Sequence, residues 1–413
     1  MALSPAPSAA VPDDRPPRPY RWAMMGGVWL VYFSFGMTNA SMAPLVHVIS
    51  GDLELSHSAM GSILGAWALV YIGLSLPCGA VLDRYGPRRM VFWAMLIIAL
   101  SGVLRSMADS YLTMFLAVAV FGIGGPLVSS GAPKVVGSWF TGKERGLGMG
   151  IYFTGNALGH VAALSLTNSV LVPLVGDWRN ALIAYAGFAV LAGFVWLAVS
   201  NHPASREMER EFAAEPRQPY HRVFFELINI PTVRIVLFMG LFILFFNHSL
   251  NAWLPEILRS GGMNATSAGY WASIPTAVGL LSALILPRLA VPERRYVILF
   301  GLFIAAAGAT LLIQAGSGPL LVAGLILQGL TRGAMTSISL LILMDTDDGS
   351  SSRVGAATGL YFAAGEIGGV LGPLSVGAVA DLSGGFNGAL FMLTGVCLIL
   401  MILLGRLRRV MRT

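Results

Sequence analysis

Long apolar segments recur along almost the whole chain and are separated by short polar breaks. A hydrophobic stretch of about 20 residues can cross a bilayer as an α-helix. A window of about 19 residues, moved along the chain, predicts twelve such helices. They cover residues 22–49, 58–82, 89–107, 112–137, 146–172, 180–200, 232–256, 267–290, 296–315, 319–344, 354–379 and 387–406. The sequence therefore predicts an all-α integral membrane protein with twelve transmembrane helices.

The composition agrees with a membrane protein. Of the 413 residues, 56% are hydrophobic and only 11% are charged. Soluble domains carry about 25% charged residues. The net charge of +6 arises from short basic clusters between apolar segments, a distribution typical of membrane topology rather than of a nucleic-acid-binding surface. We therefore expect membrane lipids as surroundings and no nucleic acid as partner.

The basic clusters also predict the orientation. If both termini are cytoplasmic, the breaks on the opposite side carry only Arg105, Arg179 and Arg259. Cytoplasmic loops are the ones enriched in lysine and arginine. We expect a multi-pass protein of the cytoplasmic (inner) membrane with both termini inside, functioning as a monomer.

The longest polar break divides the predicted helices into six and six. Two equal halves suggest a duplication, with the halves related by an axis along the membrane normal. The predicted organisation is a disordered cytoplasmic tail (1–21), a six-helix bundle (22–200), a cytoplasmic linker (201–231), a second six-helix bundle (232–406) and a basic cytoplasmic tail (407–413).

The break between the second and third predicted helices reads "GAVLDRYGPRR". This resembles the loop signature of the major facilitator superfamily, G-x-x-x-D-R-x-G-x-R-R. The matching residues are Gly79, Asp83, Arg84, Gly86, Arg88 and Arg89. The corresponding break in the second half, "PRLAVPERR", keeps the basic end but lacks the aspartate and glycine. The resemblance implies the fold of that family, with two pseudo-symmetric six-helix bundles, and secondary transport without a cofactor.

The six signature residues are assigned to gating. A carboxylate and several arginines at a helix end can bind neighbouring helix termini as a charged latch. The resemblance implies that this latch stabilises the outward-facing state. The alternative is that the arginines only anchor the topology.

Polar residues inside the predicted helices mark a candidate substrate pathway, because polar groups are costly at bilayer depth. Several recur at helical spacing, so they share one helix face. The candidate substrate-binding residues are Tyr32, Asn39, Lys134, Asn156, His160, Asn247, Asn251, Gln328 and Arg332. Interhelical packing is the alternative for Tyr32, for His160 and for the two asparagines of the seventh predicted helix, Asn247 and Asn251. The alternative for Lys134 is that its ammonium reaches the membrane surface.

Arg332 and Glu366 lie at one depth on the tenth and eleventh predicted helices, so contact between them is expected. One interpretation is a fixed ion pair. The other is that a substrate anion competes with Glu366 for the guanidinium, so that protonation of Glu366 couples anion entry to a proton. The arginine fork matches a carboxylate. This favours a small organic or inorganic anion, with a monocarboxylate as the best guess.

The leading functional hypothesis is a proton-coupled anion transporter that works by alternating access. Resemblance suggests a monocarboxylate-transporter-like or cyanate-permease-like branch. The chain has no nucleotide-binding motif of the G-x-x-x-x-G-K-[ST] kind. No metal cluster or catalytic set indicates an enzyme. The alternatives are a proton-driven exporter of drugs or metabolites and a transporter-like membrane sensor. Drug exporters of the family usually carry a proline where "GNALGHVAA" has His160.

Overall fold

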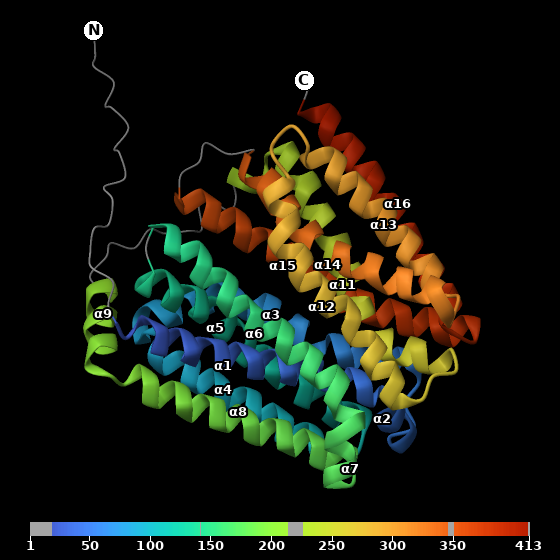
Figure 1. The fold of residues 1–413 in the computed structure, drawn as a ribbon, viewed down its shortest axis with the longest axis horizontal. Coiled ribbons are helices and arrows are strands. Elements are labelled where there is room, and N and C mark those ends of the chain that lie inside the picture. The colour runs from blue at the N-terminus through green and yellow to red at the C-terminus, as the bar shows by residue number, and fades with distance from the viewer. Residues whose placement is uncertain (1–18, 141, 214–225, 346–350, 412–413) are drawn as a thin grey trace.

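The computed structural model describes residues 19–140, 142–213, 226–345 and 351–411. The described part of the chain is almost entirely helical (Figure 1). Its first half contains α1 (Arg21–Ala40), η1 (Ala43–Leu45), α2 (Val46–Asp52), α3 (His57–Tyr85), α4 (Pro87–Ser106), α5 (Tyr111–Trp139), α6 (Gly142–Leu166), η2 (Thr167–Leu171), α7 (Val172–Val175), α8 (Trp178–Ser200) and α9 (Pro203–Ala213). Its second half contains α11 (Pro231–Ser260), α12 (Ala265–Leu289), α13 (Arg295–Ile313), α14 (Gly318–Asp345), α15 (Ser351–Ser383) and α16 (Phe386–Val410).

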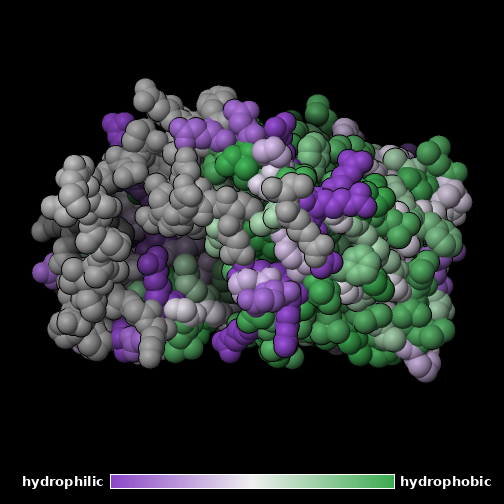
Figure 2. Space-filling model, turned by 90° about the horizontal axis from the view of Figure 1, so that it is seen from above, coloured by the Kyte–Doolittle hydropathy of each residue, from purple (hydrophilic) through white to green (hydrophobic). Residues whose placement is uncertain are grey.

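The long helices confirm the predicted membrane architecture. Within the described ranges, α1, α3, α4, α5, α6, α8 and α11 to α16 each contain at least 19 residues. Eleven of these helices, all except α1, are long and apolar enough to cross a membrane. Large hydrophobic side chains such as Trp93, Phe194 and Ile402 are exposed on the outer surface. Figure 2 shows apolar residues gathered over the right half of one face, with hydrophilic residues mainly in the middle. Such a surface suits contact with lipid rather than water.

Some helix ends differ from the predicted ones. The first predicted helix covered 22–49, but α1 ends at Ala40 and Pro44 lies in the short η1 turn before α2. Proline has no N–H for the hydrogen bond to the carbonyl of residue 40, and its ring clashes with that carbonyl, which explains the break. At the other end of the chain, α16 continues to Val410, so most of the predicted basic tail 407–413 is helical. The described part of the linker 201–231 includes α9. Residues 1–18 of the predicted tail and residues 214–225 of the linker lie outside the described ranges.

The helices pack in two groups. The first group comprises α1, α3, α4, α5, α6 and α8, and the second group comprises α11 to α16. The two groups meet where α3 packs against α15 and α6 against α12. Figure 1 shows the groups together at the end that carries α2 and α7, and diverging toward the end that carries α9. We call these the α2 end and the α9 end, and the contact region between the groups the seam.

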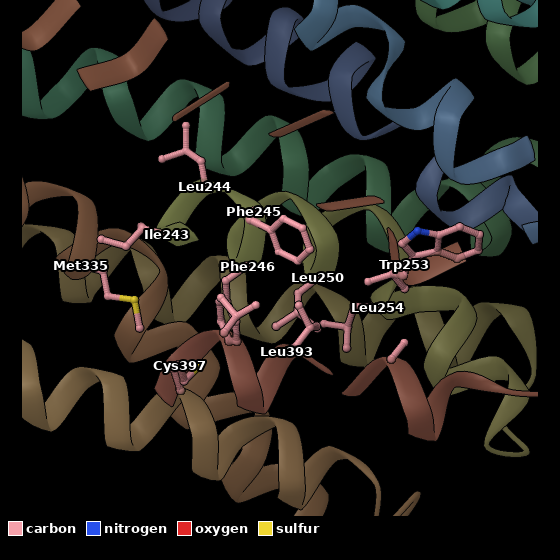
Figure 3. Close-up of a cluster of buried hydrophobic side chains, with 14 of the residues drawn as sticks. Ile243, Leu244, Phe245, Phe246, Leu250, Trp253, Leu254, Met335, Leu393 and Cys397 are labelled. Atoms are coloured by element: carbon pink, nitrogen blue, oxygen red, sulfur yellow. The ribbon is translucent and has the colours of Figure 1, made fainter. Parts of the chain in front are cut away.

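Glycines allow the close approach of α3 and α15 at the seam. A Cβ added to Gly61 would lie 2.4 Å from the carbonyl oxygen of Pro373, and one added to Gly377 would lie 2.2 Å from that of His57. Both distances are too short for any larger residue. Elsewhere the second group has a dense apolar core, in which Phe246 and Leu250 of α11 lie near Leu393 of α16 (Figure 3).

Candidate functional site at the seam

A small cavity lies at the seam and is lined by residues of five helices, α1, α6, α11, α12 and α14. The lining residues are Ala40, His160, Leu164, Leu250, Asn251, Leu254, Pro255, Ala272, Gln328 and Arg332. Four of the ten, His160, Asn251, Gln328 and Arg332, belong to the predicted substrate-binding set. The structure thus brings predicted residues from both helix groups to one cavity.

Arg332 is held on the wall of this cavity by α12. Its Nη1 donates a hydrogen bond to Oγ1 of Thr276 at 2.6 Å. Gly329 makes this approach of α14 to α12 possible, because an added Cβ would lie 2.9 Å from the carbonyl oxygen of Pro275. The carbonyl oxygen of Arg332 accepts a hydrogen bond from Nδ2 of Asn247 at 3.3 Å. Among the residues that the structure describes, no carboxylate lies within ion-pair distance of the Arg332 guanidinium.

The expected contact between Arg332 and Glu366, on which both interpretations of this pair depended, is not formed in this conformation. The carboxylate of Glu366 instead lies 3.9 Å from Nδ1 of His248. The depth was estimated correctly enough to put both residues near the seam, but their helix faces differ. Arg332 points toward α12, whereas the neighbours of Glu366 on α15, such as Gly368, pack against α11.

His248 connects the Glu366 carboxylate to the first helix group. Its imidazole stacks on the ring of Trp67 with centroids 5.4 Å apart and an interplanar angle of 22°. Trp67 lies on α3, and neither it nor Thr276 was among the predicted site residues. An apolar aromatic residue and a lone threonine carry no signal that separates them from packing residues. His248 directly follows Asn247 in the sequence, so a helix places it beside the face that Asn247 and Asn251 share.

Three predicted residues of the first helix group form one polar cluster. Nε2 of His160 lies 3.2 Å from Oδ1 of Asn39, and its Nδ1 lies 3.1 Å from the carbonyl oxygen of Asn156. Gly36 packs against that same carbonyl, with an added Cβ only 2.3 Å away. His160 therefore bridges α1 and α6 while also lining the seam cavity. The contact between helices fits the packing interpretation of His160, and its place on the cavity wall fits the binding interpretation.

Tyr32 lies apart from this polar cluster. Its side chain is buried, and its ring makes an edge contact with Tyr152 at 4.8 Å between centroids. Its hydroxyl is 3.4 Å from the carbonyl oxygen of Ser129. These contacts match the packing alternative, and we do not include Tyr32 in the seam site.

Lys134 has a partner that the sequence did not indicate. Its ammonium forms an ion pair with the carboxylate of Asp83, which connects α5 to α3. The side chain therefore neither lines the seam cavity nor extends alone toward the membrane surface. The predicted substrate-binding lysine and the predicted gating aspartate are instead one unit.

The loop signature is bound to the linker helix α9. Arg88 donates from Nε to Oε2 of Glu209 at 3.3 Å and from Nη1 to Oδ1 of Asn201 at 2.5 Å. Gly86 has a φ of +80°, and an added Cβ would lie 1.6 Å from Oε1 of Glu209. These contacts involve the first helix group and α9 only. In this conformation Arg88 and Gly86 of the loop signature thus contact Glu209 of the linker helix.

The remaining signature residues make fewer contacts. The guanidinium of Arg84 lies 5.3 Å from the centroid of the Tyr85 ring, and Arg84 and Arg89 are both exposed. A Cβ added to Gly79 would meet nothing within 4 Å. The contacts of Arg84, Arg89 and Gly79 in this conformation give no structural reason for their place in the signature.

A second contact between the groups closes the α2 end. The carboxylate of Asp381 on α15 accepts hydrogen bonds from the backbone N–H groups of His57 and Ser58 at 3.0 and 2.7 Å, and one from the Ser58 hydroxyl. These donors form the start of α3, where the first turn of a helix favours an anion. We call this contact the α2-end latch. The sequence analysis missed it.

Comparison with known proteins identifies the family. The family model described as the Major Facilitator Superfamily matches residues 28–292 and 236–413. The chain belongs to the Major Facilitator Superfamily. This agrees with the resemblance found in the loop signature, and membership makes the chain a multi-pass secondary transporter and not an enzyme.

Three relatives in the superfamily align over most of their length. The uncharacterized transporter YycB of Bacillus subtilis (strain 168) is 25% identical over 364 residues, covering 87% of this chain and 86% of the relative. The probable galactarate/D-glucarate transporter GudP of Escherichia coli (strain K12) is 22% identical over 415 residues, covering 88% and 89%. The 2-nitroimidazole transporter of the same organism is 25% identical over 387 residues, covering 89% and 90%.

The superfamily fold also appears in the comparison of structures. The crystal structure of the nucleoside transporter NupG superposes with a TM-score of 0.76 at 13% sequence identity, covering 94% of this chain and 99% of NupG. At this identity the likeness concerns the fold alone. The branch of the superfamily is not defined by these relatives, since their names include both organic acids and a drug-like heterocycle.

Proposed function

We propose that this transporter carries a small organic anion across the cytoplasmic membrane by alternating access, and that Arg332 binds the carboxylate of the substrate. The observation that carries the proposal is the position of the guanidinium. It lines the seam cavity, is oriented by Thr276, and has no carboxylate partner among the described residues. An arginine at membrane depth without a counterion is costly. An anionic substrate would supply the missing counterion.

The relatives support a substrate of this class. The name of GudP indicates two sugar diacids, galactarate and D-glucarate. Arginine binds carboxylates with two parallel hydrogen bonds, which makes it the preferred residue for such a group. The monocarboxylate of our initial expectation is one member of the broader class that we propose here.

The arrangement of the two helix groups suits alternating access. If both termini are cytoplasmic, as the basic clusters predict, then the α9 end faces the cytoplasm and the α2 end faces outward. The groups diverge at the α9 end and are joined at the α2 end (Figure 1). The conformation would then be inward-facing. Its loop signature binds α9, and transfer of this latch to the second group would accompany the outward-facing state.

We assign proton coupling to Glu366. Its side chain is only 9% exposed, and its Oε2 has no hydrogen-bond donor among the described residues. A buried carboxylate without a donor favours its neutral form, which a proton carrier requires. In this proposal the substrate and Glu366 do not compete for Arg332. Arg332 binds the substrate and Glu366 carries the proton, as two separate groups at the seam.

Counterflow in proteoliposomes tests the proposal. Vesicles are loaded with a panel of unlabelled organic acids, neutral sugars and cations, and entry of the same labelled compound is followed. We expect exchange of at least one small organic acid and of no cation. Transport restricted to neutral or cationic compounds would contradict the anion assignment.

The same vesicles separate the alternatives. A proton-driven exporter is favoured by the likeness to the 2-nitroimidazole transporter. Such an exporter would exchange an uncharged heterocycle. An imposed proton gradient would drive that compound in the direction opposite to the proton flow. A transporter-like sensor would bind its ligand without exchanging it.

A further inference from the structure

Three amide side chains at the seam present buried oxygens that accept no hydrogen bond from any described residue. They are Oδ1 of Asn247, Oδ1 of Asn251 and Oε1 of Gln328. Asn247 and Gln328 are only 7% and 1% exposed. Buried acceptors normally have a donor, so each such oxygen in a native structure requires an explanation.

The orientation of one amide is fixed by its other atom. Nδ2 of Asn247 donates to the carbonyl oxygen of Arg332 at 3.3 Å. Exchanging the oxygen and nitrogen of this amide would place two acceptors against each other. Its oxygen is therefore a true acceptor, and a donor for it must come from outside the described contacts.

Two of the three amides, those of Asn251 and Gln328, lie one helical turn away from Arg332 along the helix axes. Asn251 follows Asn247 by four residues on α11, and Gln328 precedes Arg332 by four residues on α14. Residues four apart share a helix face and are separated by about 6 Å along the axis. The two helices run in opposite directions, so Asn251 and Gln328 lie one turn nearer the α2 end than the Asn247–Arg332 contact. Both line the seam cavity together with Arg332.

We propose that the seam cavity recognises a carboxylate that carries hydroxyl groups, with the carboxylate on Arg332 and the hydroxyl donors on the oxygens of Gln328 and Asn251. This inference rests on the proposed anion transport and specifies its substrate class. A hydroxyl can donate one hydrogen bond, whereas an unsubstituted alkyl chain can donate none. The spacing of about one helical turn suits hydroxyls beyond the first carbon rather than on it alone.

The competing explanation is that the amides only hold helices together. Asparagine and glutamine do form interhelical hydrogen bonds in membranes. The contact of Asn247 with Arg332 is one such bond. This bond uses the nitrogen of the Asn247 amide and leaves its oxygen without a partner. Helix association therefore explains only one of the two polar atoms of that amide. The position of Gln328 and Asn251 on the cavity wall with the guanidinium favours the ligand.

The test compares D-gluconate with hexanoate, two six-carbon monocarboxylates that differ in their hydroxyl groups. Apparent dissociation constants are measured on the purified full-length protein from ligand-dependent thermal unfolding, followed by tryptophan fluorescence. The variants are Gln328→Met and Asn251→Leu, which remove one amide each at similar volume. Gln314→Met is the matched control, since Gln314 caps the end of α13 and donates to the Thr310 carbonyl outside the cavity.

We expect the wild type to bind D-gluconate at least about tenfold more tightly than hexanoate, because a site that hydrogen-bonds hydroxyls discriminates against analogues without them. Gln328→Met or Asn251→Leu should reduce this ratio severalfold, and Gln314→Met should preserve it. Using both cavity variants keeps the test decisive if one of them fails to fold.

Two results would overturn the inference while leaving anion transport intact. One is equal binding of D-gluconate and hexanoate by the wild type. The other is a preference for D-gluconate that persists unchanged in both cavity variants. If the wild type binds neither acid, nor lactate, nor propionate, then the proposed anion transport itself fails and the inference fails with it.

Discussion

The guanidinium of Arg332 on α14 donates to the hydroxyl of Thr276 on α12 at 2.6 Å, and this single bond sets where the positive charge of the seam cavity lies. The arginine of an apolar helix is therefore not neutralised by the glutamate of the neighbouring span. It is held in place by an uncharged group. A positioned but unneutralised cation is what an anion-binding site requires.

Thr276→Val should weaken substrate binding without changing the charge of the cavity. Valine has the shape of threonine but offers no acceptor, and a hydrogen bond to a charged group contributes about 1.5 kcal/mol, or about tenfold in affinity. We expect an increase of about tenfold in the half-saturating concentration for counterflow of the transported acid. Thr310→Val is the control, since Thr310 bonds Thr394 between α13 and α16, away from the cavity. An equal effect of both variants would indicate general destabilisation.

The α2-end latch should open in every transport cycle. Ser58 and Asp381 are in direct contact across the seam. We expect the double variant Ser58→Cys, Asp381→Cys, made with Cys78 and Cys397 replaced by alanine, to form a disulfide under mild oxidation. Transport should stop on oxidation and return on reduction, while each single cysteine variant should be insensitive. Full transport by the cross-linked protein would show that this end does not open.

Gly86→Ala should destabilise the contact between the loop signature and α9 through two separable effects. The backbone φ of +80° with ψ of 147° lies in a region that is almost exclusive to glycine, so a residue with a Cβ costs about 1–3 kcal/mol there. The new Cβ also collides with the Glu209 carboxylate. We expect a lower melting temperature than that of the wild type. In a Glu209→Ala background, which already lacks both the collision and the Arg88 contact, Gly86→Ala should lower the melting temperature by less, because only the backbone strain remains. No loss at all in that background would mean that the backbone conformation contributes nothing.

Glu366→Gln should abolish the response of uptake to a proton gradient. Glutamine has the shape of the protonated acid and cannot release a proton. We expect counterflow to continue, because exchange of labelled for unlabelled substrate needs no net proton movement, and uptake driven by an inward proton gradient to disappear. Glu256→Gln is the matched control, because Glu256 is also a buried acid of the second group but pairs with Arg259. Uptake by Glu366→Gln that still follows the gradient refutes this assignment.

Helix number and the polar stripes could be predicted from the sequence because both depend on local patterns. Apolar length determines which segments cross the membrane. Spacing of four residues placed Gln328 and Arg332 on one helix face, and both residues do line the seam cavity.

Partner choice between helices could not be predicted in the same way. The angular position of a helix in its group is set by tertiary packing, here by glycines such as Gly329 that bring α14 against α12. For that reason the depth of Arg332 in its helix correctly predicted its place at the seam, whereas the predicted contact with Glu366 is not formed. Lys134 and Asp83 illustrate the same limit, since 51 residues separate them and no local pattern connects them.

The most direct test of the account is proteoliposome counterflow of a labelled organic acid by the wild type and by Arg332→Ala, with Arg234→Ala as control. Arg234 is an exposed arginine near the start of α11, so its removal tests the loss of a charge away from the cavity. We predict that Arg332→Ala folds, reaches the vesicles and loses at least about 100-fold of the exchange rate, while Arg234→Ala retains it. Undiminished exchange of the acid by Arg332→Ala would contradict the claim that this residue binds the substrate.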